Sequence, residues 1–283
     1  MCGRVCDTLL ILLSIHVSSL LGASMERSEL QEIMPKYRDK FGCVSLYPYP
    51  KENGELFDNE NRNLFTGEAL LLLRLNDMYH MDIDLISAVQ RNYLGEGIFS
   101  RSPKGMESAH RVSHDEYTGL AILLGILKNK SRDPINSVIA SNMLDSIVSH
   151  GKTHNWMFSD HNPELGKSIK DFSKIANLGA WRVPSDQFFI KTMAGMYTSW
   201  FEEINFIGAA YLAANRPIDQ YSGRVMMWSR LKTLEYIGID SPTIKTARNI
   251  FTKRSIALYG NDYVHIIFRY FKDESHPFHK LIR

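Results

Sequence analysis

The chain has 283 residues, of which 44% are hydrophobic and 23% are charged, and its formal net charge is +2. This composition is typical of a globular protein and argues against extensive disorder. The small net charge and the absence of a dense lysine and arginine stripe argue against nucleic-acid binding. The length fits one large domain, and we assign residues 25–283 to a single helical domain.

Residues 1–24 differ from the rest of the chain. Arg4 precedes an apolar run at 9–15, and small residues follow at 21–24, which is the order of a secretory signal peptide. A misplaced start codon is the alternative, because a chain starting at Met25 reads as a cytoplasmic protein. The first interpretation predicts an exported or virion-associated protein, and the second predicts the host cytoplasm. The apolar run is too short for a membrane span, which needs about 20 residues.

Nine stretches show helical spacing of apolar residues or a helix-start signal. In chain order these predicted helices cover residues 28–40, 69–75, 83–93, 113–127, 134–151, 184–216, 222–238, 241–251 and 262–271. The last stretch also suits a buried strand. No strand–turn–strand signal and no glycine-rich phosphate loop accompanies them. We therefore expect an all-α fold, an (α/α)-toroid-like array of about eight to ten helices with long loops on one rim.

Glycines and one long apolar stripe set several predicted boundaries. Gly95 and Gly97 are expected to end the third helix, and Gly151 to end the fifth. Residues 98–112 are expected to form a loop. The sixth helix carries a stripe with spacings of three and four, which predicts one continuous helix with a buried face. The stripe consists of Met193, Tyr197, Trp200, Ile204, Ile207 and Tyr211.

One stretch, residues 111–117, gathers proton-transferring groups at the start of an apolar helix: Arg111, His114, Asp115, Glu116 and Tyr117. Ser113 and Glu116 also match a capping box, and acidic residues in a first turn suit the helix dipole. Neighbouring helical residues point about 100° apart, so Asp115 and Glu116 cannot face one substrate in the same way. If Glu116 folds back onto the cap, His114 or Asp115 remains available for acid–base chemistry.

Glu68 is a second notable carboxylate, at the entrance of the buried helix 69–75. A lone buried charge is costly, so Glu68 is expected either to pair with Arg62 or Arg101 or to line a cavity. Together with Asp115 it would supply the two carboxylates that glycoside hydrolysis uses.

Residues 152–183 form a long polar and aromatic loop, and such loops are often functional. Trp156 and Trp181 are candidate sugar platforms, because a ring stacks on apolar C–H surface while polar neighbours bind hydroxyls. Hydrophobic anchoring of the loop is the alternative. His150, His154, Asp160 and His161 do not form a metal-binding motif, and we expect no metal and no cofactor.

Short motifs over most of residues 60–280 resemble a group of uncharacterised phage and prophage proteins. They are LFTGE at 64–68, GIFSRSP at 97–103, SHDEYTG at 113–119, Ser222-Gly223 with Trp228, and HPF at 276–278. That family has no established activity, so the resemblance implies a viral or prophage context and no reaction. The helix count and the acidic helix mouth are also similar to those of helical-toroid glycan enzymes. That analogy of fold does not assign a function.

These features favour a polysaccharide-active glycoside hydrolase, or a lyase in which His114 or Tyr117 is the base and Arg111 neutralises a uronate. The candidate catalytic residues are Asp115, Glu116, Glu68, His114 and Tyr117, and the candidate substrate-binding residues are Arg111, Arg101, Trp156 and Trp181. A non-catalytic virion-associated or accessory phage protein is the alternative, in which the polar cluster only caps a helix. A polysaccharide partner is expected, with no nucleic acid and no stable membrane span; the oligomeric state stays open.

Overall fold

The structure is a computed structural model, which describes residues 28–38, 42–44, 62–79, 85–100, 114–158, 182–216, 221–268 and 276–282. Ten α-helices have both ends within these ranges, beside one two-stranded sheet. The all-α fold class predicted from the sequence is therefore confirmed. No helix in the described ranges combines the length and the apolar character that a membrane span requires.

The elements follow one another in this order: η1 (Met34–Tyr37), α2 (Arg62–Leu75), α3 (Leu85–Gln90), β1 (Tyr93–Gly95), β2 (Ile98–Phe99), α5 (His114–Lys130), α6 (Pro134–Thr153), α7 (Pro184–Ala194), α8 (Trp200–Asn215), α9 (Tyr221–Ile237), α10 (Pro242–Tyr259), α11 (Tyr263–Ile267) and α12 (Pro277–Leu281). The stretch before η1, residues 28–33, is also helical. The tail at 263–267 is a helix, which decides between the two forms that the sequence left open.

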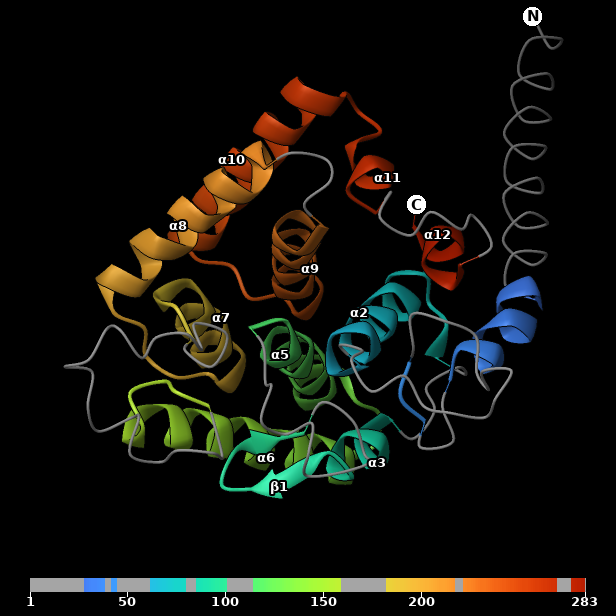
Figure 1. Ribbon diagram of the computed structural model, residues 1–283, viewed down its shortest axis with the longest axis vertical. Helices are drawn as coiled ribbons and strands as arrows, with labels where there is room; N and C mark the ends of the chain where they lie inside the picture. The colour runs from blue at the N-terminus through green and yellow to red at the C-terminus, as the bar shows by residue number, and fades with distance from the viewer. Residues whose placement is uncertain are drawn as a thin grey trace, which may run out of the picture.

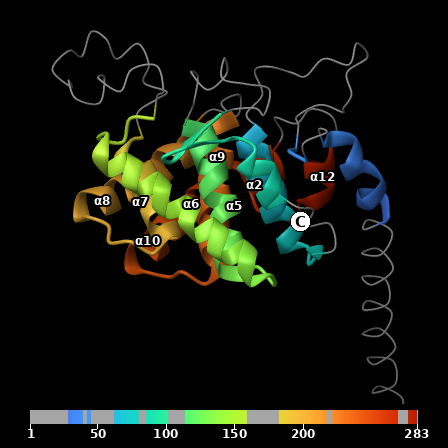
Figure 2. The same cartoon turned by 90° about the horizontal axis from the view of Figure 1, so that it is seen from below.

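Helix α5 lies in the middle of the molecule (Figure 1). It packs against α2, α6, α7 and α9, and residues 120–124 within it are fully buried. A helix surrounded on all sides has no polar face, which explains the unbroken apolar run in the sequence. Figure 2 shows α6 lying along α5, while α8 and α10 pair with each other further away. The ring closure of an (α/α)-toroid stays a prediction.

Two glycines set the distance between α2 and α5. A Cβ atom on Gly67 would lie 2.8 Å from the carbonyl carbon of Gly119, and one on Gly119 would lie 2.6 Å from the carbonyl carbon of Asn63. The two backbones therefore touch, and neither position has room for a side chain. Gly67 is a packing residue within α2, which begins at Arg62 and not at residue 69 as predicted.

A short hairpin follows α3, where the sequence predicted helix ends and a loop. Tyr93 pairs with Phe99, and Gly95 pairs with Ile98. Glu96 and Gly97 have φ values of 50° and 80°, the left-handed conformation that a tight hairpin turn needs at both central residues. The expectation of no strand pairing was wrong because glutamate rarely occupies a position that asparagine or aspartate usually fills.

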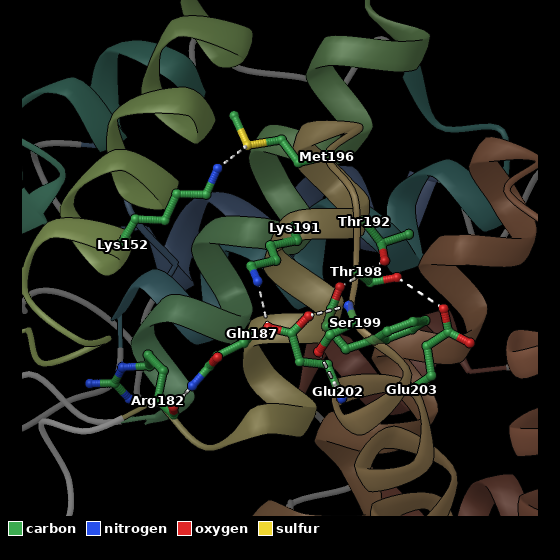
Figure 3. Close-up of polar contacts among 11 residues, drawn as sticks. Lys152, Arg182, Gln187, Lys191, Thr192, Met196, Thr198, Ser199, Glu202 and Glu203 are labelled. Atoms are coloured by element: carbon green, nitrogen blue, oxygen red, sulfur yellow. Dashed lines mark hydrogen bonds and ion pairs between the residues drawn. The ribbon is translucent and has the colours of Figure 1, made fainter.

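The predicted helix over 184–216 is two helices. Helix α7 ends at Gly195, whose φ of 75° is left-handed. Helix α8 begins after Ser199, whose hydroxyl accepts a hydrogen bond from the Glu202 N–H while the Glu202 carboxylate accepts one from the Ser199 N–H. Figure 3 shows this capping box and the ammonium group of Lys191, which pairs with Glu202 at 2.5 Å. The capping box and the ion pair fix the corner between the two helices.

Because α7 and α8 are separate helices, the residues of the predicted apolar stripe do not share one buried face. Met193 on α7 is buried and Ile207 on α8 is partly buried against the core, but Tyr197, Trp200, Ile204 and Tyr211 are exposed. The prediction of a buried stripe was wrong, because the buried face of α8 consists of other residues, among them Phe206, Ala210 and Ala214. Helix α8 therefore has an exposed apolar face.

Candidate functional site

A cavity of about 330 Å³ lies where the N-terminal ends of α5, α7 and α9 meet the C-terminal half of α8. This volume is within the range of small-ligand sites. Methionines and alanines form part of its lining. Its polar lining residues are Asp115, Ser185, Asp186, Arg216 and Arg230. We refer to this cavity as the pocket.

Asp186 and Arg230 form a buried ion pair in the wall of the pocket. The Nη2 atom of Arg230 lies 2.6 Å from Oδ1 of Asp186 and 2.5 Å from Oγ1 of Thr118. These residues belong to α7, α9 and α5, so one guanidinium group connects three helices at the pocket. Because the pair is buried, removal of either charge would leave the other uncompensated.

A second guanidinium group, that of Arg182, is buried at the position just before Val183, which lines the pocket. Its Cζ atom is 5.0 Å from the ring centroid of Tyr117 and 5.6 Å from that of Phe158. Burial lowers the pKa of Arg182 from its usual value, while the charges of nearby groups, led by Asp186 and including Asp115, oppose that fall. Asp186 thus lies near two guanidinium groups, those of Arg230 and Arg182.

Asp115 is the sequence-predicted catalytic residue that lines the pocket. It is the second residue of α5, and Asp186 is the third residue of α7, so both carboxylates lie at helix N-termini, where the helix dipole favours negative charge. The sequence reasoning missed Asp186, although an acidic residue in a first turn was the signal that identified Asp115.

Glu116 and Tyr117 point into the core. The Oε2 atom of Glu116 accepts a hydrogen bond of 3.2 Å from the N–H of Asn63, which is one of the unpaired N–H groups at the start of α2. The hydroxyl of Tyr117 donates to the carbonyl oxygen of Gly97 at 2.9 Å, and burial raises the pKa of this phenol. A phenol that holds its proton so firmly is poorly suited to be the base of a lyase.

Glu68 lies in the middle of α2 and is buried against α9. Its Oε1 atom accepts a hydrogen bond of 3.1 Å from the hydroxyl of Ser229. Glu68 is not among the residues that line the pocket, so the structure does not bring it to Asp115 there. The second carboxylate of the pocket is Asp186.

Trp156 packs against α6, and little of its ring is exposed. A Cβ atom on Gly151 would lie 2.6 Å from Cε3 of Trp156, so the glycine makes room for the indole. The carbonyl oxygen of Trp156 accepts a hydrogen bond of 2.8 Å from the N–H of Arg182. This geometry matches the loop-anchoring alternative. Helix α6 continues past Gly151 to Thr153, contrary to the predicted end.

The remaining sequence-predicted residues lie outside the described part of the chain. They are Arg101, Arg111, Trp181 and the side chain of His114, together with Asp160 and His161. Their roles stay predictions. Among the described residues, no group of three or more histidine, cysteine and acidic side chains is arranged to hold a metal ion.

His150 and His154 stack with ring centroids 4.1 Å apart, and Nε2 of His150 lies 3.1 Å from the carbonyl oxygen of Met157. Burial, and after it the charge of His154, lowers the pKa of His150 below its usual 6.5. The unfolded chain therefore binds a proton more readily than the folded protein. Stability should fall as the pH drops below about 6.5 and stop falling once the pH is below the folded pKa.

We expect His150→Gln to reduce this pH dependence, because glutamine is neutral and its amide reaches the Met157 carbonyl. The measurement is the free energy of unfolding in urea at about pH 7.5 and about pH 5.5. His265→Gln, at an exposed histidine of α11, is the control and should retain the wild-type difference. Equal pH dependence in wild type and His150→Gln would contradict the assignment.

Comparison of the chain with protein-family models, with curated proteins and with solved structures finds no match. The chemistry of the pocket therefore rests on its own groups. Two carboxylates can exchange protons with a bound ligand, and guanidinium and hydroxyl groups can donate hydrogen bonds to it. Met226 and Met227 offer flexible apolar surface to its carbon atoms. Such a mixture suits a polar ligand with apolar faces, as sugars are.

Proposed function

We propose that this protein is a glycoside hydrolase that cleaves a glycosidic bond of a polysaccharide. The observation that carries the proposal is the convergence of Asp115 and Asp186, from two helices, on the lining of one cavity. Glycoside hydrolysis uses two carboxyl groups on either side of the scissile bond, one of which protonates the leaving oxygen. The pocket has the volume for one small sugar unit beside them.

The proposal assigns different roles to the two carboxyl groups. Asp186 accepts a hydrogen bond directly from Arg230, so it stays ionised and serves as base or nucleophile. Asp115 then serves as the acid. The firmly held proton of Tyr117 favours a hydrolase over the lyase that would use this phenol as its base.

The wider context of the protein belongs to the same proposal. The (α/α)-toroid arrangement stays a prediction, because α5 packs against α2, α6, α7 and α9 and lies between them. The phage-like motifs support a viral or prophage source, and export depends on whether residues 1–24 are a leader. Bacterial surface polysaccharides are therefore the first substrates to test.

The test is to incubate the purified full chain with a panel of bacterial surface polysaccharides and to measure new reducing ends. We expect Asp115→Asn and Asp186→Asn to lower the rate by about 10²–10⁴-fold, the usual contribution of an acid–base group. Asparagine retains the shape of the side chain, so Asp115→Asn should remain folded by circular dichroism. Asp186→Asn removes the charge that pairs with the buried Arg230, so its unfolding is measured as well and its rate is compared only under conditions in which it is folded.

Asp145→Asn provides the matched control, because Asp145 is exposed on α6, outside the pocket lining. It should retain full activity. Failure of the wild type to cleave any polysaccharide, or full activity of both pocket variants, would reject the hydrolase proposal.

A second candidate function is a non-catalytic virion-associated or accessory role. The exposed apolar face of α8 favours it, because monomeric proteins rarely leave such a face open to water. An assembly role needs this face and does not need the pocket carboxylates. The two candidates therefore respond to different substitutions.

A further inference from the structure

Five large apolar side chains are exposed on α8: Trp200 (71%), Phe201 (53%), Ile204 (58%), Tyr211 (50%) and Leu212 (63%). With 100° between successive residues, all five fall within an arc of about 120° on one side of the helix. The opposite side of α8 packs against α7 and α10 (Figure 1). We call the exposed arc the α8 face.

The area of the α8 face is large for a surface that stays in water. A large aromatic side chain presents roughly 150–250 Å² when fully exposed, so the five exposed fractions amount to about 550 Å². The largest apolar patch of a typical monomer is about 300–600 Å², and such patches are often functional. With its polar rim, the α8 face approaches the roughly 800 Å² that each partner buries in a stable complex.

Gly208 lies in the middle of the α8 face, and no close packing within the described residues requires a glycine there. A Cβ atom at Gly208 would meet nothing within 4 Å, whereas at every other glycine inside a described α-helix it would meet a neighbouring atom. A glycine inside a helix lowers stability relative to alanine. A glycine at this position would let a second helix cross α8 closely.

The charges near the α8 face indicate which kind of partner covers it. Helix α8 contains no lysine or arginine, and its glutamates, Glu202 and Glu203, contact Lys191 and Thr243 on the opposite side. Helices that lie on anionic membranes carry cations beside their apolar face, which α8 lacks. Among the described residues, the guanidinium group of Arg254 lies at the C-terminal end of the arc, where it donates to Oδ1 of Asn215 at 2.6 Å. A second α8 face is equally apolar between Trp200 and Leu212 and has the same glycine at its centre.

We propose that two copies of this chain associate through their α8 faces, with the two helices crossing at Gly208 about a twofold axis. Twofold dimers are the commonest oligomers, and their interface uses the same patch on both copies. Trp200 and Tyr211, on either side of the crossing along α8, then pack against the partner helix. The dimer proposal does not rest on the hydrolase activity, and Leu212 belongs to both the α8 face and the pocket lining.

The first test measures the mass of the full chain by light scattering over a series of concentrations. The wild type should be a dimer, and Ile204→Lys should weaken dimerisation at least about hundredfold, because symmetry places the charge in the interface twice. Ile135→Lys is the matched control: Ile135 is 67% exposed but lies on α6, and this variant should dimerise like the wild type.

The second test examines the crossing point. With Cys2 and Cys6 replaced by serine and the buried Cys43 retained, Gly208→Cys should form a disulfide-linked dimer under mild oxidation. Lys253→Cys, exposed on α10, should not. A wild type that is monomeric at all concentrations, or equal dimerisation of both lysine variants, overturns the proposal. If a monomeric wild type instead binds phosphatidylcholine vesicles and Ile204→Lys does not, a membrane occupies the face.

Discussion

Gly119→Ala should destabilise the protein by about 3 kcal/mol or more, one of the two largest effects we expect. The new Cβ atom would lie 2.6 Å from the carbonyl carbon of Asn63 and closer still to its oxygen and to Leu64 Cα. These are backbone atoms, which cannot move aside by a change of rotamer, so α2 and α5 must separate. That movement opens the centre of the core, where α5 packs against four helices.

Thermal unfolding provides the measurement, with an expected decrease in Tm of roughly 10 °C for a chain of this size. Gly208→Ala is the matched control, measured at protein concentrations low enough for monomers. Nothing lies within 4 Å of a Cβ atom at Gly208, and alanine is the better helix former, so this variant should unfold at the same or a higher temperature. A Gly119→Ala protein as stable as wild type would mean that the two backbones are not in contact.

The helices were predictable from the sequence because their signals are local. Asp133 accepts a hydrogen bond from the Ile135 N–H ahead of Pro134, as the predicted start of that helix required. The apolar run at 120–127 predicted a buried helix, and α5 is buried on all sides. Spacing and capping depend on neighbouring residues, so one sequence suffices to recognise them.

Burial of the α8 stripe was not predictable in the same way. The spacing of Trp200, Ile204 and Tyr211 identifies one side of a helix, but the same spacing describes a side that faces a partner molecule. The corner before α8 was recognisable, since Gly195 and the Ser199–Glu202 capping box are local signals. The apolar spacing continues unchanged across residues 195–199, so it predicted one continuous helix.

Only part of the pocket could be predicted, for a related reason. Asp115 stands out because its acidic and aromatic neighbours are adjacent in the sequence. Asp186 acquires its significance from Arg230, 44 residues later, and Thr118 lies 112 residues before that arginine. The contact of these three side chains depends on how α5, α7 and α9 pack together, which cannot be read from helical periodicity.

Arg230→Met should destabilise the protein by about 3–5 kcal/mol, the second large effect. Methionine fills much of the volume of arginine, so the loss arises mainly from the carboxylate of Asp186, which loses its ion pair with Arg230 and retains only the more general influence of the Arg182 charge. The hydrogen bond to Thr118 is lost as well. The measurement is the free energy of unfolding in urea.

The combination of Arg230→Met with Asp186→Leu tests this origin of the loss. Because the double variant leaves no unpaired charge from this pair, it should recover a large part of the stability that Arg230→Met alone loses, although its pocket no longer has a second carboxylate. Lys232→Met breaks an exposed ion pair with Glu235 on the same helix and should change stability by less than about 1 kcal/mol. If the double variant is no more stable than Arg230→Met, packing and not the buried charge accounts for the effect. A double variant that folds well yet cleaves no polysaccharide would separate the contribution of Asp186 to stability from its contribution to catalysis.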